Sequence, residues 1–143
     1  MPSTMRRHVV TGAILALSSL KSLSGCAAER AHSRVSQGND AGRMSTLESA
    51  IKNMTANPVC ESDADCRAIG FGAKACGGPK SFLYYSIRTL DETSLKTQVE
   101  EYNALARKRN RESGAISDCS IVEPQIPRCV AAAGKKKCQG TNP

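Results

Sequence analysis

The chain has 143 residues, a formal net charge of +7, and only five aromatic residues, none of them tryptophan. Three of its 20 basic residues lie among the first 25 positions, which hold no acidic residue, so the other 118 positions carry 17 basic and 13 acidic side chains. Their net charge of +4 is too small to indicate a nucleic-acid-binding protein. A length of 118 residues limits this part to one domain.

The first 25 residues have the organisation of a secretory signal peptide. Arg6 and Arg7 precede a mostly apolar run, Val9 to Leu20, which is shorter than the ~20 residues of a bilayer-spanning helix. Small residues follow, and the region ends in Leu23-Ser24-Gly25-Cys26. This tetrapeptide resembles the lipobox of bacterial lipoproteins. The resemblance implies cleavage before Cys26 and acylation, palmitate included, of its thiol and its new amino group.

The same resemblance implies a location in the cell envelope. Ala27 follows the cysteine, where an aspartate would favour retention in the inner membrane, so we expect a lipid anchor in the outer membrane. The alternative is an ordinary secretory signal cut near Ala27 or Ala28, which would give a soluble secreted protein. Residues 26–43 are small, polar and without periodicity, and they are expected to form a flexible tether.

A cysteine-rich domain is expected over residues 44–143, beginning with a short helix. Ser45 and Glu48 have the spacing of a capping box, and Pro58 is expected to end the helix at Asn57. Four apolar residues recur at helical spacing and are expected to face the core: Met44, Leu47, Ile51 and Met54.

With Cys26 set aside as the lipid site, an even number of cysteines remains. They are Cys60, Cys66, Cys76, Cys119, Cys129 and Cys138. In an exported chain this number predicts three disulfides within a core spanning 60–138, with 15 pairings open. The six-cysteine pattern resembles that of small exported bacterial domains, a resemblance that carries no named activity. No Cys-x-x-Cys occurs and the spacings do not match zinc knuckles, so neither a redox motif nor a metal site is expected.

The rest of the domain alternates short strands with one long helix. Asp63 and Asp65 are expected to cap a turn, because the positions after them lack the glycine and glutamate of a calcium loop. The remaining expected elements are a strand over 67–73, a tight turn over 76–79, a strand or helical turn over 81–87, a helix over 93–112 ending at Gly114, and a hairpin over 129–138. The predicted fold class is α+β: a small disulfide-stabilised domain with one long helix, one shorter helix and a few short antiparallel strands.

The sequence predicts a non-catalytic protein. After the signal peptide the one histidine is His32, in the expected tether, so no Ser–His or Cys–His pair is available, and no cofactor is implied. We expect a rigid protein-binding module that contacts the membrane through its lipid and another envelope protein through its domain, with no nucleic-acid partner. Immunity and entry-exclusion lipoproteins are built in this way, although only the anchor resembles them.

Two other functions remain open. One is a protease-inhibitor-like module that would present the segment Pro124–Cys129, with Arg128, as an exposed loop. The other is a binder of anions such as lipopolysaccharide. Its basic residues would be Arg107, Lys108, Arg109, Arg111, Lys135, Lys136 and Lys137.

Overall fold

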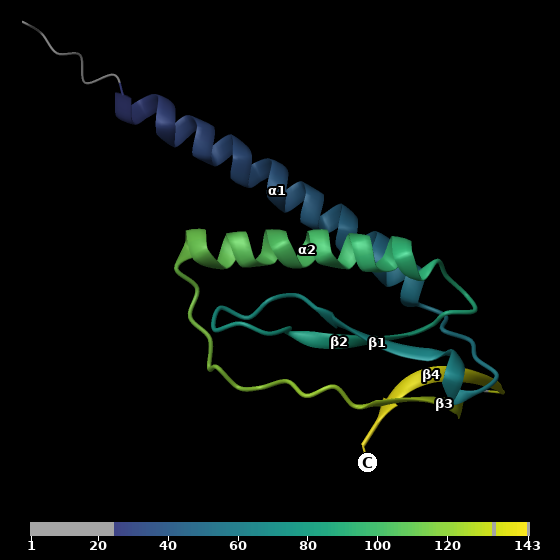
Figure 1. Cartoon of the computed structure of the whole chain (residues 1–143). Helices are drawn as coiled ribbons and strands as arrows, with labels where there is room; N and C mark the ends of the chain where they lie inside the picture. The colour runs from purple at the N-terminus through teal and green to yellow at the C-terminus, as the bar shows by residue number, and fades with distance from the viewer. Residues whose placement is uncertain (1–24, 133, 143) are drawn as a thin grey trace, which may run out of the picture.

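The computed structural model describes residues 25–132 and 134–142. Its elements are α1 (Gly25–Thr55), a 3-10 helix η1 (Asp63–Asp65), β1 (Cys66–Phe71), β2 (Ser81–Ser86), α2 (Glu92–Ser113), β3 (Ile126–Ala132) and β4 (Lys135–Thr141). Two helices above two antiparallel hairpins confirm the predicted α+β class (Figure 1). The predicted signal peptide up to Ser24 and the side chain of Cys26 lie outside the described residues.

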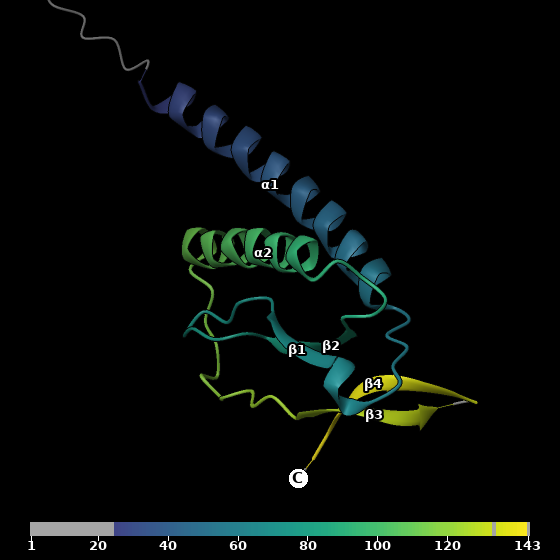
Figure 2. The same ribbon diagram turned by 45° about the vertical axis from the view of Figure 1, so that its right-hand side comes forward.

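The expectation of a flexible tether over residues 26–43 is wrong, because α1 already begins at Gly25. Ser45 therefore lies inside the helix and cannot cap its start. The tether segment contains no proline, and its strongest helix breakers are Gly38 and Gly42, each costing ~1 kcal/mol relative to alanine. Such a cost lowers helix stability without forbidding the helix. In Figures 1 and 2, the N-terminal part of α1 runs well beyond the end of α2.

Ion pairs hold the later part of this segment against α2. Asp40 Oδ2 accepts from Lys108 Nζ at 2.6 Å, and both Glu101 carboxylate oxygens accept from the guanidinium of Arg43 at 2.6 Å. These partners are 58 and 68 residues apart in the chain, so local sequence patterns do not reveal them. Tertiary contacts thus extend the packed region of α1 upstream of Met44.

Of the predicted stripe of α1, Met44 packs in a cluster with Ala73 and Ala106. Other apolar side chains of both helices meet in a small core above β1 and β2. Its fully buried members are Leu47 and Ile51 from α1, Leu95 and Val99 from α2, and Tyr85 from β2. α2 matches its predicted range closely, because Asp91 caps its start and Gly114, at φ +62°, ends it. A core with so few large side chains buries little apolar area, so covalent links contribute much of the stability.

Two disulfides attach the second hairpin to Cys60, which precedes β1, and to Cys66, the first residue of β1. Cys129 and Cys138 are direct cross-strand partners in β3 and β4, and they are bonded to Cys60 and Cys66 respectively. The third disulfide joins Cys76, in the connection between β1 and β2, to Cys119, after α2. The three predicted disulfides are confirmed, and so is the C-terminal hairpin, with Gly134 at its turn at φ +78°.

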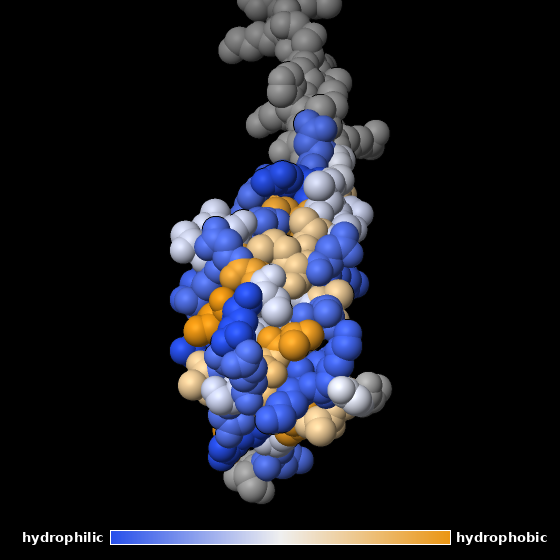
Figure 3. Space-filling view, turned by 90° about the vertical axis from the view of Figure 1, so that its right-hand side faces the viewer, coloured by the Kyte–Doolittle hydropathy of each residue, from blue (hydrophilic) through white to orange (hydrophobic). Residues whose placement is uncertain are grey.

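The surface does not present one continuous apolar area on the side nearest the hairpin turn. On the face turned toward the viewer in Figure 3, hydrophobic residues form small patches separated by hydrophilic ones. Within 25–132 and 134–142, no helix combines the length and the apolar character needed to cross a bilayer.

Candidate functional site

Two irregular segments lie side by side at the end of the molecule that holds the C-terminus of α2. We call residues 73–80, between β1 and β2, the glycine loop, and residues 115–125, between α2 and β3, the linker. The linker has no regular secondary structure, and it descends from α2 past the glycine loop toward β3 (Figure 1). The Cys76–Cys119 disulfide joins the two segments covalently.

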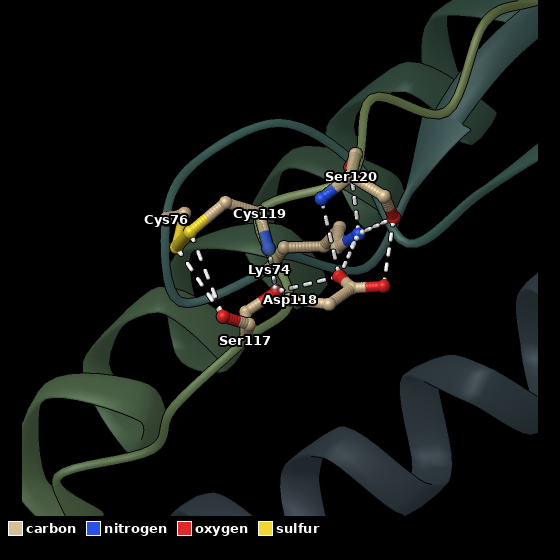
Figure 4. A network of polar contacts seen from close by, with 6 residues as sticks. All are labelled: Lys74, Cys76, Ser117, Asp118, Cys119 and Ser120. Atoms are coloured by element: carbon tan, nitrogen blue, oxygen red, sulfur yellow. Dashed lines mark hydrogen bonds and ion pairs between the residues drawn. A yellow bond between two sulfur atoms is a disulfide. The ribbon is translucent and has the colours of Figure 1, made fainter.

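Lys74 forms the centre of a polar network between them (Figure 4). Its Nζ donates to Asp118 Oδ1 at 2.8 Å, and to Ser120 O and Ser120 Oγ at 2.7 Å each. Ser120 in turn donates to Asp118 through its backbone N–H at 3.2 Å and its hydroxyl at 2.9 Å. The ammonium group therefore has an acceptor for each of its three protons.

The electrostatics of this network favour the charged form of Asp118. The ammonium of Lys74, the hydroxyl of Ser120 and the backbone N–H of Ser120 hold the pKa of Asp118 far below its ordinary value. The Lys74 side chain is 14% exposed, whereas that of Asp118 is 70% exposed. A lysine with every proton bound inside the protein has no donor left for a substrate, so Lys74 acts as a structural clamp.

Two asparagines on α2 hold the end of β1 and the first residue of the glycine loop from the other side. Asn103 accepts from Gly72 N at 2.7 Å and donates to Gly70 O at 3.1 Å, while Asn110 donates to Ala73 O at 2.9 Å. These side chains are seven residues apart and therefore lie on the same face of the helix. The start of the glycine loop is thus attached to α2. The next residue, Lys74, binds Asp118 and Ser120 and so joins the glycine loop to the linker.

The linker presents two large apolar side chains to solvent. Ile116 is 97% exposed and Ile121 is 86% exposed. Between them, Cys119 adopts a left-handed backbone conformation, at φ +55°, which is unusual for a residue other than glycine. At its far end the linker is held by Tyr84, whose hydroxyl accepts from Gln125 N at 3.0 Å. The two isoleucines therefore lie on a backbone that is fixed between them and after them.

Three hollows of about 370 to 440 Å³ surround the glycine loop. The one of about 440 Å³ separates the loop from the end of α2 and is lined by Lys74, Arg107 and Arg111 together with glycine and alanine residues. Asp118 is the one acidic residue among the described residues that line the three hollows, and it is already paired with Lys74. The surroundings of the glycine loop are therefore basic.

The basic residues predicted for anion binding do not form one surface. Arg107 and Arg111 border the glycine loop, whereas Arg109 lines a different hollow between α1 and α2. Arg107 also pairs with Glu100, and Lys108 with Asp40. The three lysines 135–137 begin β4, and Figure 1 shows the turn of that hairpin at the opposite end of the molecule from the C-terminus of α2.

The segment predicted as a protease-inhibiting loop is a strand over most of its length. β3 begins at Ile126, so the expectation of an exposed loop over Pro124–Cys129 is wrong for residues 126–129. Arg128 Nη1 donates to Asp63 Oδ2 at 2.7 Å, and Cys129 N donates to Asp63 Oδ1 at 2.7 Å. These two contacts lower the pKa of Asp63, with the backbone N–H contributing most. Residues 126–129 are therefore a strand paired with β4, and Arg128 is held in an ion pair rather than standing on a free loop.

The predicted turn-capping role is confirmed for Asp65, whereas Asp63 instead binds Arg128 and the backbone N–H of Cys129. Asp65 Oδ2 accepts from the backbone N–H groups of Glu61 at 2.8 Å and Ser62 at 3.1 Å, and these bonds lower its pKa. Lys74, Asn103, Asn110 and Ser120, in contrast, were not singled out from the sequence. The helical spacing of the two asparagines was a usable signal, but nothing local connected Lys74 to residues more than 40 positions away.

No family model, curated protein or solved structure matches this chain. The arguments for its function therefore come from the residues and the geometry described above.

Proposed function

We propose that this protein is a non-catalytic, disulfide-rigidified binding module of the cell envelope, held at the outer membrane by a lipid on Cys26. Its domain docks on another envelope protein, as an adaptor, immunity or exclusion factor does. The docking element is the linker, residues 115–125. The observation that carries this proposal is the near-complete exposure of Ile116 and Ile121 on a backbone that is held in place by a disulfide and by the hydrogen bonds of Lys74.

The rigidity of the linker supports a binding role because ordering a mobile segment opposes association. Side-chain and loop ordering at an interface costs ~0.5–1.5 kcal/mol per immobilised side chain. Here the disulfide, the Lys74 network and the Tyr84 hydroxyl fix the backbone before any partner arrives. Burying an isoleucine side chain contributes ~1.5–3 kcal/mol. Burial of the two isoleucines on docking therefore contributes favourably to the free energy of binding, while little conformational entropy of the linker is lost.

The first helix gives this module a defined reach. α1 contacts α2 at Asp40, so the 15 residues 25–39 extend about 22 Å beyond this contact at 1.5 Å per residue. A lipid on Cys26 would sit at the start of this helix, with the packed part of α1 near its other end. The linker would then be presented at a distance from the membrane, where the surface of an envelope protein is accessible.

The docking proposal is tested by photocrosslinking in the native cell. A photoreactive amino acid is placed at Ile116 or Ile121, with Ile87 as the matched control. Ile87 is also an exposed isoleucine, at 39%, but it precedes α2 whereas the linker follows it. We expect one discrete crosslinked protein from positions 116 and 121 and none from position 87.

The affinity for the identified partner is then measured with purified proteins. Ile116→Ser and Ile121→Ser should each weaken binding by about 10- to 100-fold, the equivalent of ~1.5–3 kcal/mol of lost apolar burial. Equal crosslinking from all three positions, or an unchanged affinity of both serine variants, would contradict the docking role of the linker.

The anchor is tested independently by intact-mass measurement of the mature protein extracted from membranes. We expect a chain that begins at Cys26 and carries acyl groups, and a Cys26→Ser variant that no longer fractionates with membranes. An unlipidated mature chain in the wild type would remove the membrane part of the proposal and would leave the docking part to be judged by the crosslinks.

A further inference from the structure

We infer that Cys76–Cys119 is a site of thiol–disulfide exchange, at which an external dithiol reduces the bridge while the other two disulfides stay intact. The inference of exchange depends only on the surroundings of this disulfide. Its consequence, loosening of the linker, rests on the proposed function.

The three disulfides differ sharply in their exposure. Cys60, Cys66 and Cys138 are 3–4% exposed and pack together, with Cys129 partly buried against them. Cys76 and Cys119 are both exposed. The neighbours of Cys76 add to its accessibility, because a Cβ atom placed on Gly77 or Gly78 would meet no atom within 4 Å. A thiolate therefore reaches this bridge from solvent, whereas the other two require the hairpin to open first.

The charge around the bridge favours the attacking species. Exchange proceeds through a thiolate, and basic surroundings stabilise that form. Lys74, Arg107 and Arg111 line the hollow that Gly77 also borders. Lys74 is paired with Asp118 and Arg107 with Glu100, so these two pairs are neutral and Arg111 supplies the net positive charge of this lining. An anionic reductant therefore meets a net positive environment at the exposed bridge.

The reaction balances as a two-electron transfer. A thiolate of the dithiol attacks one sulfur of the bridge, a mixed disulfide forms, and the other cysteine leaves as a thiolate. The second thiol of the dithiol then displaces the protein sulfur. The dithiol becomes a cyclic disulfide, and Cys76 and Cys119 each become a thiol once their thiolates are protonated.

Opening the bridge changes the linker without unfolding the domain. Cys119 is held at φ +55° between Asp118 and Ser120, both of which Lys74 also binds. Reduction removes the covalent attachment and leaves the lysine network as the main hold on this stretch. The two buried disulfides still join the hairpin of β3 and β4 to residues 60 and 66, so the rest of the fold is retained.

The test uses the intact protein, dithiothreitol as the probe, and quenching with N-ethylmaleimide followed by peptide mass mapping. Under native conditions we expect Cys76 and Cys119 to be labelled at least tenfold faster than the other four cysteines, because those require local opening. In urea the rates should converge. Equal native rates, or earlier labelling of Cys60, Cys66, Cys129 or Cys138, would overturn the inference.

Two further measurements separate this inference from the proposed function. Hydrogen exchange of the linker amides should accelerate in the selectively reduced protein, and more so in Lys74→Met, while the amides of α2 stay protected; unchanged linker exchange would refute the loosening. Crosslinking from position 116 should fall in the reduced protein, and its persistence would refute an effect on docking. Absence of that crosslink in the oxidised protein would refute the proposed docking function, whereas the labelling order would still decide the exchange site.

Discussion

Removal of single disulfides provides a quantitative test of how this small domain is stabilised. A bridge stabilises mainly by restricting the unfolded chain, with a contribution that rises with the logarithm of the loop length. For the 43-residue separation of Cys76–Cys119 the contribution is about 4.0 kcal/mol, and for the 72-residue separation of Cys66–Cys138 it is about 4.4 kcal/mol. Loop closure alone therefore makes the two bridges almost equivalent.

Burial makes them different. Cys66 and Cys138 are packed in the interior, so replacing both with alanine also leaves space where two sulfur atoms were. Removal of a methylene-sized buried group costs ~0.5–1.5 kcal/mol, so this pair should lose ~1–3 kcal/mol more than loop closure predicts. The Cys76–Cys119 bridge lies at the surface, so the double variant Cys76→Ser, Cys119→Ser should lose no more stability than the loop-closure contribution of about 4 kcal/mol. The loss is smaller where the remaining bridges already confine the unfolded chain.

The assay is equilibrium unfolding in urea, followed by circular dichroism without reductant. The free energies of unfolding extrapolated to water must be compared, rather than the urea concentrations at the midpoints. Loss of a crosslink expands the unfolded state and so increases the dependence of the free energy of unfolding on urea concentration. We expect the variant without Cys66–Cys138 to be the less stable by at least ~1 kcal/mol. A greater loss for the exposed pair would refute the argument that burial distinguishes these bridges.

Three other substitutions test separate parts of the structure. Leu95 is fully buried in the core, so Leu95→Ala should lower the free energy of unfolding by ~2–5 kcal/mol in the same urea assay, and a loss below 1 kcal/mol would show a loosely packed core. Burial and the hydrogen bond to Glu92 raise the pKa of Tyr85 to about 12, above the value of the unfolded chain, so wild-type stability should fall between pH 10 and pH 12 and Tyr85→Phe should fall less over that range. Lys74 lowers the pKa of Asp118, so the contribution of the Asp118 carboxylate to stability is present at neutral pH and is lost as the pH falls below about 4. Asp118→Asn should therefore lower the free energy of unfolding more at pH 7 than at pH 2. Equal losses at both pH values would contradict the ion pair.

The parts of the fold that the sequence predicts well are those set by neighbouring residues. The range of α2 follows from its apolar stripe, from Asp91 at its start and from Gly114 at its end. The C-terminal hairpin follows in the same way from Gly134 between two cysteine-containing segments. The prediction of a tether is wrong because polar composition does not exclude a helix: the segment holds no proline, and its C-terminal end is packed against α2.

The candidate site was beyond the reach of local patterns. Lys74 and Ser120 are 46 residues apart, and the disulfide pairing that brings their segments together was one of 15 possibilities. The exposure of Ile116 and Ile121 depends on where α2 and the glycine loop place the linker, which no local pattern reveals. Long-range geometry, rather than composition, makes this stretch a candidate for recognition.

The position of the buried bridges has a consequence for proteolysis. The linker precedes Cys129 and Cys138, and each of these is bonded to a residue located before β2. A protease that severed the peptide bond after Ile121 would therefore release no fragment, because both pieces would stay joined through sulfur. Such a nicked molecule would migrate as one band in a non-reducing gel and as two after reduction. A segment this exposed can thus suffer a cut in a protease-rich surrounding without the domain coming apart.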